Sequence, residues 1–315
     1  DADYSWLIDT LKKQNPAVKI YICRLTPIFN DHSRFKSGTR DWFWQIQSHI
    51  PNIAKANQVG LIDLHEKLYP RPDLFPDALH PTKEGATILA QTVYENITQD
   101  FGGLKLAAIF TDNMVLQRNQ PIQIHGTANG GDTIEVTFKQ QKKNVIVDQY
   151  GKWKISFPAL TKGGPYEITV QSKATKIVLK NILVGDVWFC SGQSNMAFQL
   201  QNSENGLAEA KKAIANSSIR FFNAKAIQDT DETAWDAATL TKTNQLQFFS
   251  GSWSVCDSIS AKEFSAIAYY FGKNIAHEEN VPVGLIQVAV GGSPIESWID
   301  RYTLEHDDKV VDILT

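Results

Sequence analysis

The chain has 315 residues, of which 43% are hydrophobic and 21% charged, and its formal net charge is −3. These values are typical of a soluble globular protein that is long enough for two or three domains. The slight negative charge offers no basic face, so nucleic acid is not expected as a partner. No apolar run approaches the roughly 18 to 20 residues that cross a bilayer, so no membrane partner is expected either.

The cysteines and the first residue give limited information. Cys23, Cys190 and Cys256 are widely spaced and form no Cys-x-x-Cys pattern, so neither a zinc site nor a disulfide scaffold is predicted. Cys23 and Cys190 lie in apolar runs, where cysteine usually behaves as a small buried hydrophobe. The sequence opens at Asp1 rather than Met and shows no signal peptide, so we expect a processed or truncated piece of a longer protein.

Residues 1–101 alternate between helical and extended patterns. Strands that alternate with helices indicate a parallel sheet and an α/β fold. The predicted helices cover 3–13, 42–57 and 82–98, and the predicted strands cover 18–25 and 59–64.

The pattern changes after residue 101. Over 104–183, short extended segments such as 122–125, 133–138 and 166–170 are separated by Gly, Asn and Asp turns, which predicts a β-sandwich. From residue 184 the α/β pattern returns, with strands at 186–190, 219–223 and 283–290 and helices at 206–215 and 261–279. The predicted fold class is therefore α/β, with α/β pieces at 1–101 and 184–315 and a β-sandwich domain between them.

Ser194 is the first candidate for chemistry. It follows Gly192 and the apolar run 184–190, at the position where a strand turns into a helix. Such a turn exposes a serine hydroxyl above the edge of the sheet. Serine needs a base to remove its proton and backbone donors to hold an oxyanion, and the glycines before Ser293 could bring backbone to the same edge. The alternative is an ordinary N-cap serine.

Asp77 and His80 are the second candidate. Their spacing places both in the loop before the helix at 82–98. A histidine can accept a proton while an aspartate fixes its tautomer and stabilises the imidazolium. The alternative is a surface turn in which both side chains are satisfied locally and Pro81 begins the helix.

Other polar residues are expected to have no chemical role. Lys142 and Lys143 are interpreted as a solvated hairpin tip, and His125 as a structural residue within a β segment. His277 and His306 fall on helical stretches with acidic neighbours and are expected to be exposed.

Several motifs resemble the sialate O-acetylesterase family, a branch of the SGNH hydrolases with a β domain before the nucleophile. They cover 110–118, 184–196, 264–271 and 281–298. The resemblance extends over about 104–315 and implies a flavodoxin-like α/β fold. It also implies a serine esterase that removes acetyl groups from sialic acid or other carbohydrate esters, without metal or organic cofactor.

The same resemblance implies roles for individual residues. Ser194 would be the nucleophile, and the backbone amides of Ser194 and Gly292 would be the oxyanion donors. Gln193, Asn195 and Trp298 would contact the acetylated carbohydrate substrate. Trp298 could instead be part of the core or of a pocket wall, which is the more common use of a large aromatic residue.

Residues 1–101 look like the last part of a different SGNH hydrolase, of the GDSL type. The block 77–81 matches the final motif of that family, which would make His80 the base and Asp77 its partner. This segment lacks an upstream Gly-Asp-Ser-type nucleophile, and 184–315 stops before the Asp/His block of its own family. The chain therefore resembles the tail of one esterase joined to the head of another.

Three interpretations stay open. The chain could be an inactive piece of a tandem carbohydrate esterase, or its two ends could complement each other so that Asp77 and His80 serve Ser194. It could also be a carbohydrate-binding module without a complete triad. Polysaccharide deacetylation would place the protein in the periplasm or outside the cell, and the sequence indicates no oligomeric state, sugar or acetyl position.

Overall fold

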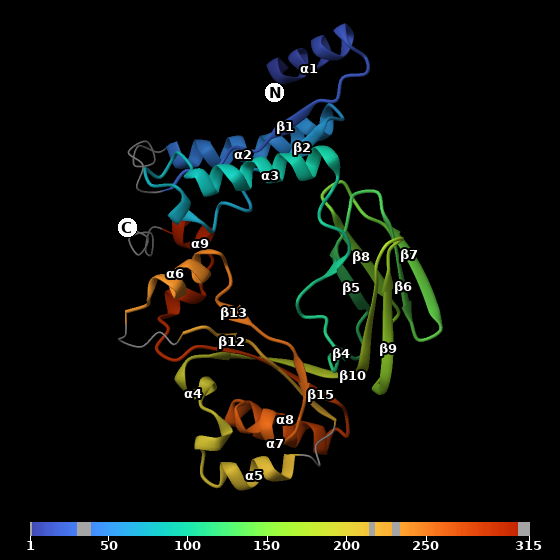
Figure 1. The fold of residues 1–315 in the computed structure, drawn as a ribbon, viewed down its shortest axis with the longest axis vertical. Helices are drawn as coiled ribbons and strands as arrows, with labels where there is room; N and C mark the ends of the chain where they lie inside the picture. Colours follow the sequence, from blue (N-terminus) through green and yellow to red (C-terminus); the bar gives the residue numbers. More distant parts are fainter. Residues whose placement is uncertain (1, 30–38, 214–217, 229–233, 308–315) are drawn as a thin grey trace. The chain divides into compact units, whose positions relative to one another are not determined.

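The computed structural model describes residues 2–29, 39–213, 218–228 and 234–307 (Figure 1). The chain divides into two compact units. The first unit joins Asp1–Thr98 to Ile295–Thr315, and the second unit is Gln99–Pro294. Each unit is described by itself below.

The first unit is an α/β unit with a small parallel sheet. Strand β1 runs parallel to β2, with Tyr21 beside Gly60, as the alternation of helices and strands predicts. A Cβ at Gly60 would lie 2.3 Å from the Tyr21 ring, so this position requires glycine. The elements are α1 (Ala2–Gln14), β1 (Tyr21–Cys23), α2 (Thr39–Ala56), β2 (Gly60–Ile62), the 3₁₀ helix η2 (Pro72–Leu74), α3 (Lys83–Thr98), the 3₁₀ helix η5 (Ile295–Trp298) and α9 (Arg301–His306).

Two apolar clusters hold the first unit together. One packs α1 and α2 against the small sheet and contains Ile8, Ile22, Ile50, Ile53 and Ala54. The other surrounds the loop before α3 and contains Phe29, Leu68, Leu74, Phe75 and Ala78. The second cluster fixes the loop that carries Asp77 and His80, because Ala78 is only 6% exposed between them.

The segment after residue 294 packs as part of the first unit. Tyr69 Oη donates a hydrogen bond to Glu305 Oε2 at 2.5 Å, and the Trp44 ring meets the rings of Tyr302 and His306. His306 was expected to be exposed, and this is wrong, because its Nε2 atom is buried in this aromatic cluster. The domain expected over 184–315 is therefore divided at residue 294 in the structure.

The β-rich part of the second unit contains two antiparallel groups of strands. Side chains from both groups fill one core, in which the Phe138 ring meets the Phe157 ring edge-on at 5.6 Å. One group has the order β3-β5-β8, and the other has the order β9-β6-β7. Their bounds are β3 (Lys105–Leu106), β4 (Val115–Gln117), β5 (Ile122–Thr127), β6 (Thr133–Phe138), β7 (Gln141–Ile146), β8 (Lys152–Phe157) and β9 (Gly163–Gln171).

The hairpin tip between β6 and β7 lies three residues earlier than expected. Phe138 pairs with Gln141, so the turn residues are 139–140. Lys142 and Lys143 lie inside β7, where Lys142 forms an ion pair with Glu135 at 2.9 Å. Both lysines are exposed, as expected, but they do not form the hairpin tip, because the strand begins before them.

Strand β10 (Lys176–Gly192) belongs to both halves of the second unit. Its first part pairs antiparallel with β9, and its last part pairs parallel with β15 (Val283–Ala289). The expected boundary between residues 183 and 184 is therefore crossed by one continuous strand. The resulting sheet has the order β14-β11-β15-β10-β9-β6-β7.

The remaining elements complete the α/β half of the second unit. Strands β10, β15 and β11 are parallel, so Gly192, Ala289 and Asn223 lie near the same edge of the sheet. The helix expected at 261–279 is interrupted, because Ser265 Oγ accepts a hydrogen bond from Ala268 N and caps a new helix. The elements not yet given are α4 (Ser194–Ala197), the 3₁₀ helix η3 (Leu200–Asn202), α5 (Gly206–Lys212), β11 (Ile219–Asn223), β12 (Lys225–Ala226), α6 (Ala237–Asn244), β13 (Phe249–Ser250), β14 (Trp253–Val255), α7 (Ser258–Lys262) and α8 (Ala266–Glu278).

The three cysteines are free thiols, and Cys190 and Cys256 are buried. Cys23 is exposed, contrary to expectation, because its side chain is on the outer face of the short strand β1. Among the helices within the described ranges, none has the length and apolarity needed to cross a membrane.

Candidate active site

Ser194 lies at a sharp turn between a strand and a short helix. Strand β10 ends at Gly192, where φ is +156°, and α4 begins at Ser194. A Cβ at Gly192 would lie 3.1 Å from the Met196 side chain, so glycine allows the helix to start close to the strand. The Ser194 side chain is exposed and forms no hydrogen bond with another described residue. The turn therefore presents a free hydroxyl at the carboxyl edge of the parallel strands.

The loop after β15 approaches this hydroxyl. A Cβ built on Gly291 would lie 4.0 Å from Ser194 Oγ, so backbone without a side chain borders the serine. The neighbouring Gly292 has φ +75°, a conformation that favours glycine. Two hydrogen bonds hold the loop beside the turn: Val290 N donates to Gly192 O at 3.3 Å, and Gln193 Nε2 donates to Ser293 O at 2.8 Å.

Gln193 was expected to contact substrate. In the structure its side-chain amide joins the serine turn to the loop after β15, so Gln193 helps to position the two segments. The expected Asn195 is exposed beside Ser194.

Two buried polar residues stabilise the serine turn through hydrogen bonds, and the sequence analysis identified neither of them. Gln287 Oε1 accepts a hydrogen bond from Ser265 N at 2.8 Å, and Ser265 Oγ donates to Met196 Sδ at 3.4 Å. Ser265 is fully buried and Gln287 is 6% exposed. The signal in the sequence is a single amide in the otherwise apolar strand β15, and a buried amide of that kind must find partners.

Asp77 and His80 form a hydrogen-bonded pair in the first unit. Asp77 Oδ2 lies 2.7 Å from His80 Nδ1, and Asp77 Oδ1 accepts from the backbone N–H groups of His80 and Leu79. The hydrogen bond with the His80 side chain is the largest cause that lowers the pKa of the Asp77 carboxyl well below its ordinary value, and the hydrogen bond from the His80 backbone N–H is the next largest. Because Nδ1 faces the carboxylate and the imidazole is 77% exposed, Nε2 is left to exchange protons.

The structure divides the expected site residues into two groups. Gln193, Ser194, Asn195 and Gly292 lie in the Gln99–Pro294 unit. Asp77, His80 and Trp298 lie in the other unit, where Trp298 ends η5 and is 41% exposed. Over the residues that the structure describes, no group of three or more His, Cys, Asp or Glu side chains could hold a metal ion.

A buried histidine in the first unit is a further unexpected feature. His65 is 3% exposed and stacks on the Tyr69 ring at 4.6 Å between centroids. Burial, with a smaller effect of the Arg24 charge, lowers the pKa of His65 to about 4. Burial and the hydrogen bond to Glu305 raise the pKa of Tyr69. His65 is therefore neutral at physiological pH.

Comparison with known families confirms the resemblance of both ends. Residues 1–88 match the GDSL-like Lipase/Acylhydrolase family, and residues 184–311 match the family described as Carbohydrate esterase, sialic acid-specific acetylesterase. The two matches include the motif at 77–81 and those at 184–196, 264–271 and 281–298. Neither match extends over half of the chain.

Individual relatives agree with these families. Sialate O-acetylesterase from Homo sapiens is 28% identical over 214 residues, which cover 64% of this chain and 40% of that protein. The Mus musculus protein of the same name is 27% identical over 219 residues, or 39% of its length. A carbohydrate acetylesterase from Xanthomonas citri has a crystal structure similar to this one, with a TM-score of 0.54 and 30% identity over 64% of this chain and 44% of that one. The chain thus spans about 40% of the curated relatives that it matches.

Proposed function

We propose that the chain carries the nucleophile of a carboxylic ester hydrolase that removes O-acetyl groups from sialic acid or other carbohydrate esters. The observation that supports this most strongly is the exposed hydroxyl of Ser194 after Gly192, bordered by the side-chain-free backbone of Gly291. The likeness to carbohydrate acetylesterases supports the same substrate class for this segment.

In the proposed reaction, Ser194 Oγ attacks the carbonyl carbon of the acetyl ester while a base removes the hydroxyl proton. The backbone N–H groups of Ser194 and Gly292 donate to the oxyanion as it forms. Collapse of the tetrahedral intermediate releases the sugar hydroxyl, which takes the proton from the base, and leaves an acetyl group on Ser194. Water then attacks this acyl-enzyme and releases acetate.

The base that we propose for this chemistry is His80, oriented by Asp77. His80 Nε2 would accept the proton, while Asp77 holds Nδ1 and stabilises the imidazolium that results. The pair would serve Ser194 if the two ends of the chain complement each other, or another nucleophile if each end belongs to a separate esterase. The dependence of turnover on His80 distinguishes these two assignments. The acetylated-carbohydrate substrate class also motivates the proposal of a periplasmic or extracellular location.

Hydrolysis of 4-nitrophenyl acetate by the 315-residue chain tests the nucleophile. We expect Ser194→Ala to lower turnover at least about 10³-fold, because no other group replaces the covalent step. The matched control is Ser191→Ala, which removes an exposed hydroxyl from the end of β10 and should leave turnover unchanged. Equal turnover in the Ser194→Ala variant would contradict the assignment.

The same assay with His80→Ala assigns the base. A loss similar to that of Ser194→Ala means that both residues act in one reaction. Turnover that needs Ser194 but not His80 assigns another base to Ser194.

A further inference from the structure

The last part of strand β10 is paired on one side. Asp186 donates its backbone N–H to the chain just before β15 at 2.9 Å, and the Gly192 carbonyl oxygen accepts from the residue just after β15. Backbone groups alternate along a strand, so Val187, Phe189 and Ser191 direct theirs to the side away from β15. These three residues therefore decide whether β10 has a second neighbour.

The side of β10 away from β15 has no partner strand at these residues. Strand β4 pairs with residues 183–185, and Val187 N then donates to Gln117 Oε1 at 2.9 Å. Within the described ranges, the Val187 carbonyl oxygen and the backbone N–H and C=O groups of Phe189 and Ser191 have no hydrogen-bond partner. We call these free groups the β10 edge. It is bounded by β4 at one end and by the serine turn at the other.

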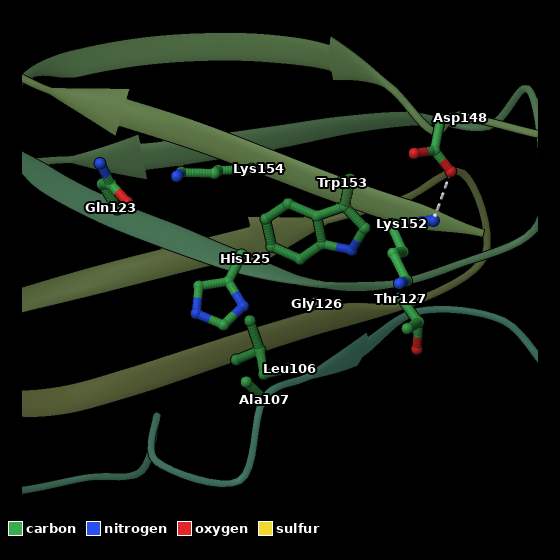
Figure 2. A pocket seen from close by; sticks show the side chains of 10 residues that line it. All are labelled: Leu106, Ala107, Gln123, His125, Gly126, Thr127, Asp148, Lys152, Trp153 and Lys154. Carbon is green, nitrogen blue, oxygen red and sulfur yellow. Dashed lines mark hydrogen bonds between the residues drawn. The ribbon is translucent and has the colours of Figure 1, made fainter. Parts of the chain in front are cut away.

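The strands at the ends of the other sheet groups are protected against pairing with another chain. Lys152 and Lys154 lie on β8, where Figure 2 shows them along a cavity, and Lys142 and Lys143 lie on β7. Strands β3 and β14 have only two and three residues. Charged side chains and short length are common protections of a sheet edge. The β10 edge has neither, because residues 187–193 include no charged residue and no proline.

The side chains at the β10 edge are apolar and exposed on both faces of the sheet. Phe189 is 67% exposed on one face. Trp188 is 42% exposed on the other face, where its ring meets Phe271 of α8 edge-on at 5.0 Å. Strands in a parallel sheet are normally buried on both faces. A free edge with exposed aromatic side chains is typical of a surface that pairs with another strand.

We propose that the β10 edge pairs antiparallel with the same edge of a second copy of this chain, with Phe189 of both copies at the two-fold axis. In this register each Phe189 N–H donates to the Phe189 carbonyl oxygen of the other copy. Each Ser191 N–H donates to the Val187 carbonyl oxygen of the other copy, while Gln117 keeps its hydrogen bond to Val187 N.

Three properties of the edge favour a second copy as the occupant. The free groups are self-complementary about Phe189, as a two-fold interface requires. The two copies offer segments of equal length, because β4 and the serine turn bound both in the same way. No like charges meet, since Asp186 at the start of the segment is already paired with Arg118. The two Phe189 rings lie directly opposite each other, which is a stabilising cross-strand pair.

Sedimentation velocity of the 315-residue chain tests the proposal. Because the paired segment is short, we expect reversible dimerisation rather than a permanent complex. The mass should rise from that of a 35.2 kDa monomer toward twice that value as the concentration increases. A range from about 1 to about 200 μM covers the affinities of such weak interfaces. A chain that stays monomeric over this range would overturn the proposal.

A lysine at the two-fold axis tests where the copies meet. Phe189→Lys removes the ring pair and places like charges opposite each other, so dimerisation should weaken at least about tenfold. The matched control is Ile259→Lys, which replaces another exposed apolar side chain of the same unit, on α7, and should leave dimerisation unchanged. Equal effects of the two substitutions would overturn the contact at β10.

A disulfide tests the register. Directly opposite residues that exchange both backbone hydrogen bonds have Cα atoms about 5.5 Å apart, a separation that a disulfide can bridge. In a Cys23→Ser background, which removes the exposed native thiol, Phe189→Cys should form a covalent dimer on oxidation and Ile259→Cys should not. Failure of Phe189→Cys to cross-link would overturn the register.

Hydrogen exchange distinguishes a second copy from any other occupant of the edge. The amides of Phe189 and Ser191 should exchange more slowly as the protein concentration increases, because only the dimer protects them. Slow exchange at every concentration would mean that the edge is paired within one chain and would overturn the inference.

Discussion

The Asp77–His80 pair is defined almost entirely by local chain geometry. Asp77 accepts hydrogen bonds from two backbone N–H groups within the next three residues and also binds the imidazole of His80. Ala78 between them has φ +60° and points into an apolar cluster. Because these contacts span four residues, they agree both with a proton-transfer pair and with the locally satisfied surface turn that the spacing left open.

Replacing Asp77 by asparagine tests the orienting role of the carboxylate. If His80 is the base, Asp77→Asn should lower turnover by about 10² to 10⁴-fold, because the imidazolium loses its anionic partner and the ring its preferred tautomer. Glu66→Gln, which neutralises another exposed carboxylate of the same unit, is the control and should have no effect. Unchanged turnover of Asp77→Asn in the assay with 4-nitrophenyl acetate would show that the pair does not act in that reaction.

His65 predicts how the stability of the first unit depends on pH. Its pKa is about 4 in the folded protein, against an ordinary value of 6.5, so the unfolded chain binds the proton more readily. The free energy of unfolding should therefore decrease as pH falls from about 6.5 to about 4, by up to about 3 kcal/mol in total, and this contribution should not change above or below that window.

Urea denaturation at several pH values measures this dependence. The His65→Gln variant removes the titrating group and should lose that part of the pH slope. An identical slope in both proteins would contradict the assignment to His65.

At the scale of elements, strand β10 joins the β-rich half of the second unit to the serine turn. The two halves were predicted from their different periodicities, which are local properties of the sequence. Their continuity was not predicted, because one strand that changes partners from β9 to β15 carries no local signal. Arg118 reinforces the junction with a two-point ion pair to Asp186, at 2.7 and 2.9 Å.

Gly185 tests the importance of this junction for stability. A Cβ at this position would lie 1.9 Å from Pro282 O, so Gly185→Ala must displace β10 from the chain that leads into β15. We expect the free energy of unfolding of the second unit to fall by about 2 kcal/mol or more. Lys180→Ala, at an exposed position of the same strand, should change it by less than about 0.5 kcal/mol. Equal effects of the two substitutions in thermal unfolding would contradict this explanation.

Helix and strand positions were otherwise predicted well where the periodicity is strong. Strand β11 begins and ends at the expected residues, Ile219 and Asn223. The break between α7 and α8 was missed because the apolar pattern on both sides of Ser265 is continuous and hides the local cap, in which Ser265 Oγ accepts from Ala268 N. Gln287, on a distant strand, adds a hydrogen bond from Ser265 N.

At the scale of the whole molecule, the division into two units does not follow the order of the sequence. Residues 295–307 follow the serine-bearing unit in the chain but pack with Asp1–Thr98. The contacts that hold them join Glu305 to Tyr69 and Tyr302 to Trp44, across more than 230 residues of sequence. The sequence placed His306 on a helical stretch with acidic neighbours and gave no packing partner for that stretch, which explains why His306 was wrongly expected to be exposed.

Glu305 tests this packing. Its carboxylate is 1% exposed and binds Tyr69 and Arg301, so Glu305→Ala leaves two polar groups without their partner and should destabilise the first unit by about 3 kcal/mol. Hydrogen exchange should accelerate in α2 and α3, with no change over residues 99–294. The control is Glu296→Gln, which neutralises another carboxylate of the segment after residue 294 and should leave hydrogen exchange unchanged. Unchanged exchange in α2 and α3 would show that the segment after residue 294 does not stabilise that unit.

The measurement that tests the central claim most directly is mass spectrometry of the 315-residue chain after reaction with a fluorophosphonate, which labels activated serine nucleophiles. We predict one covalent adduct, located on Ser194, with no labelling of the Ser194→Ala variant and normal labelling of Ser191→Ala. An adduct on another serine, or none on a folded chain, would contradict the assignment of Ser194 as the nucleophile.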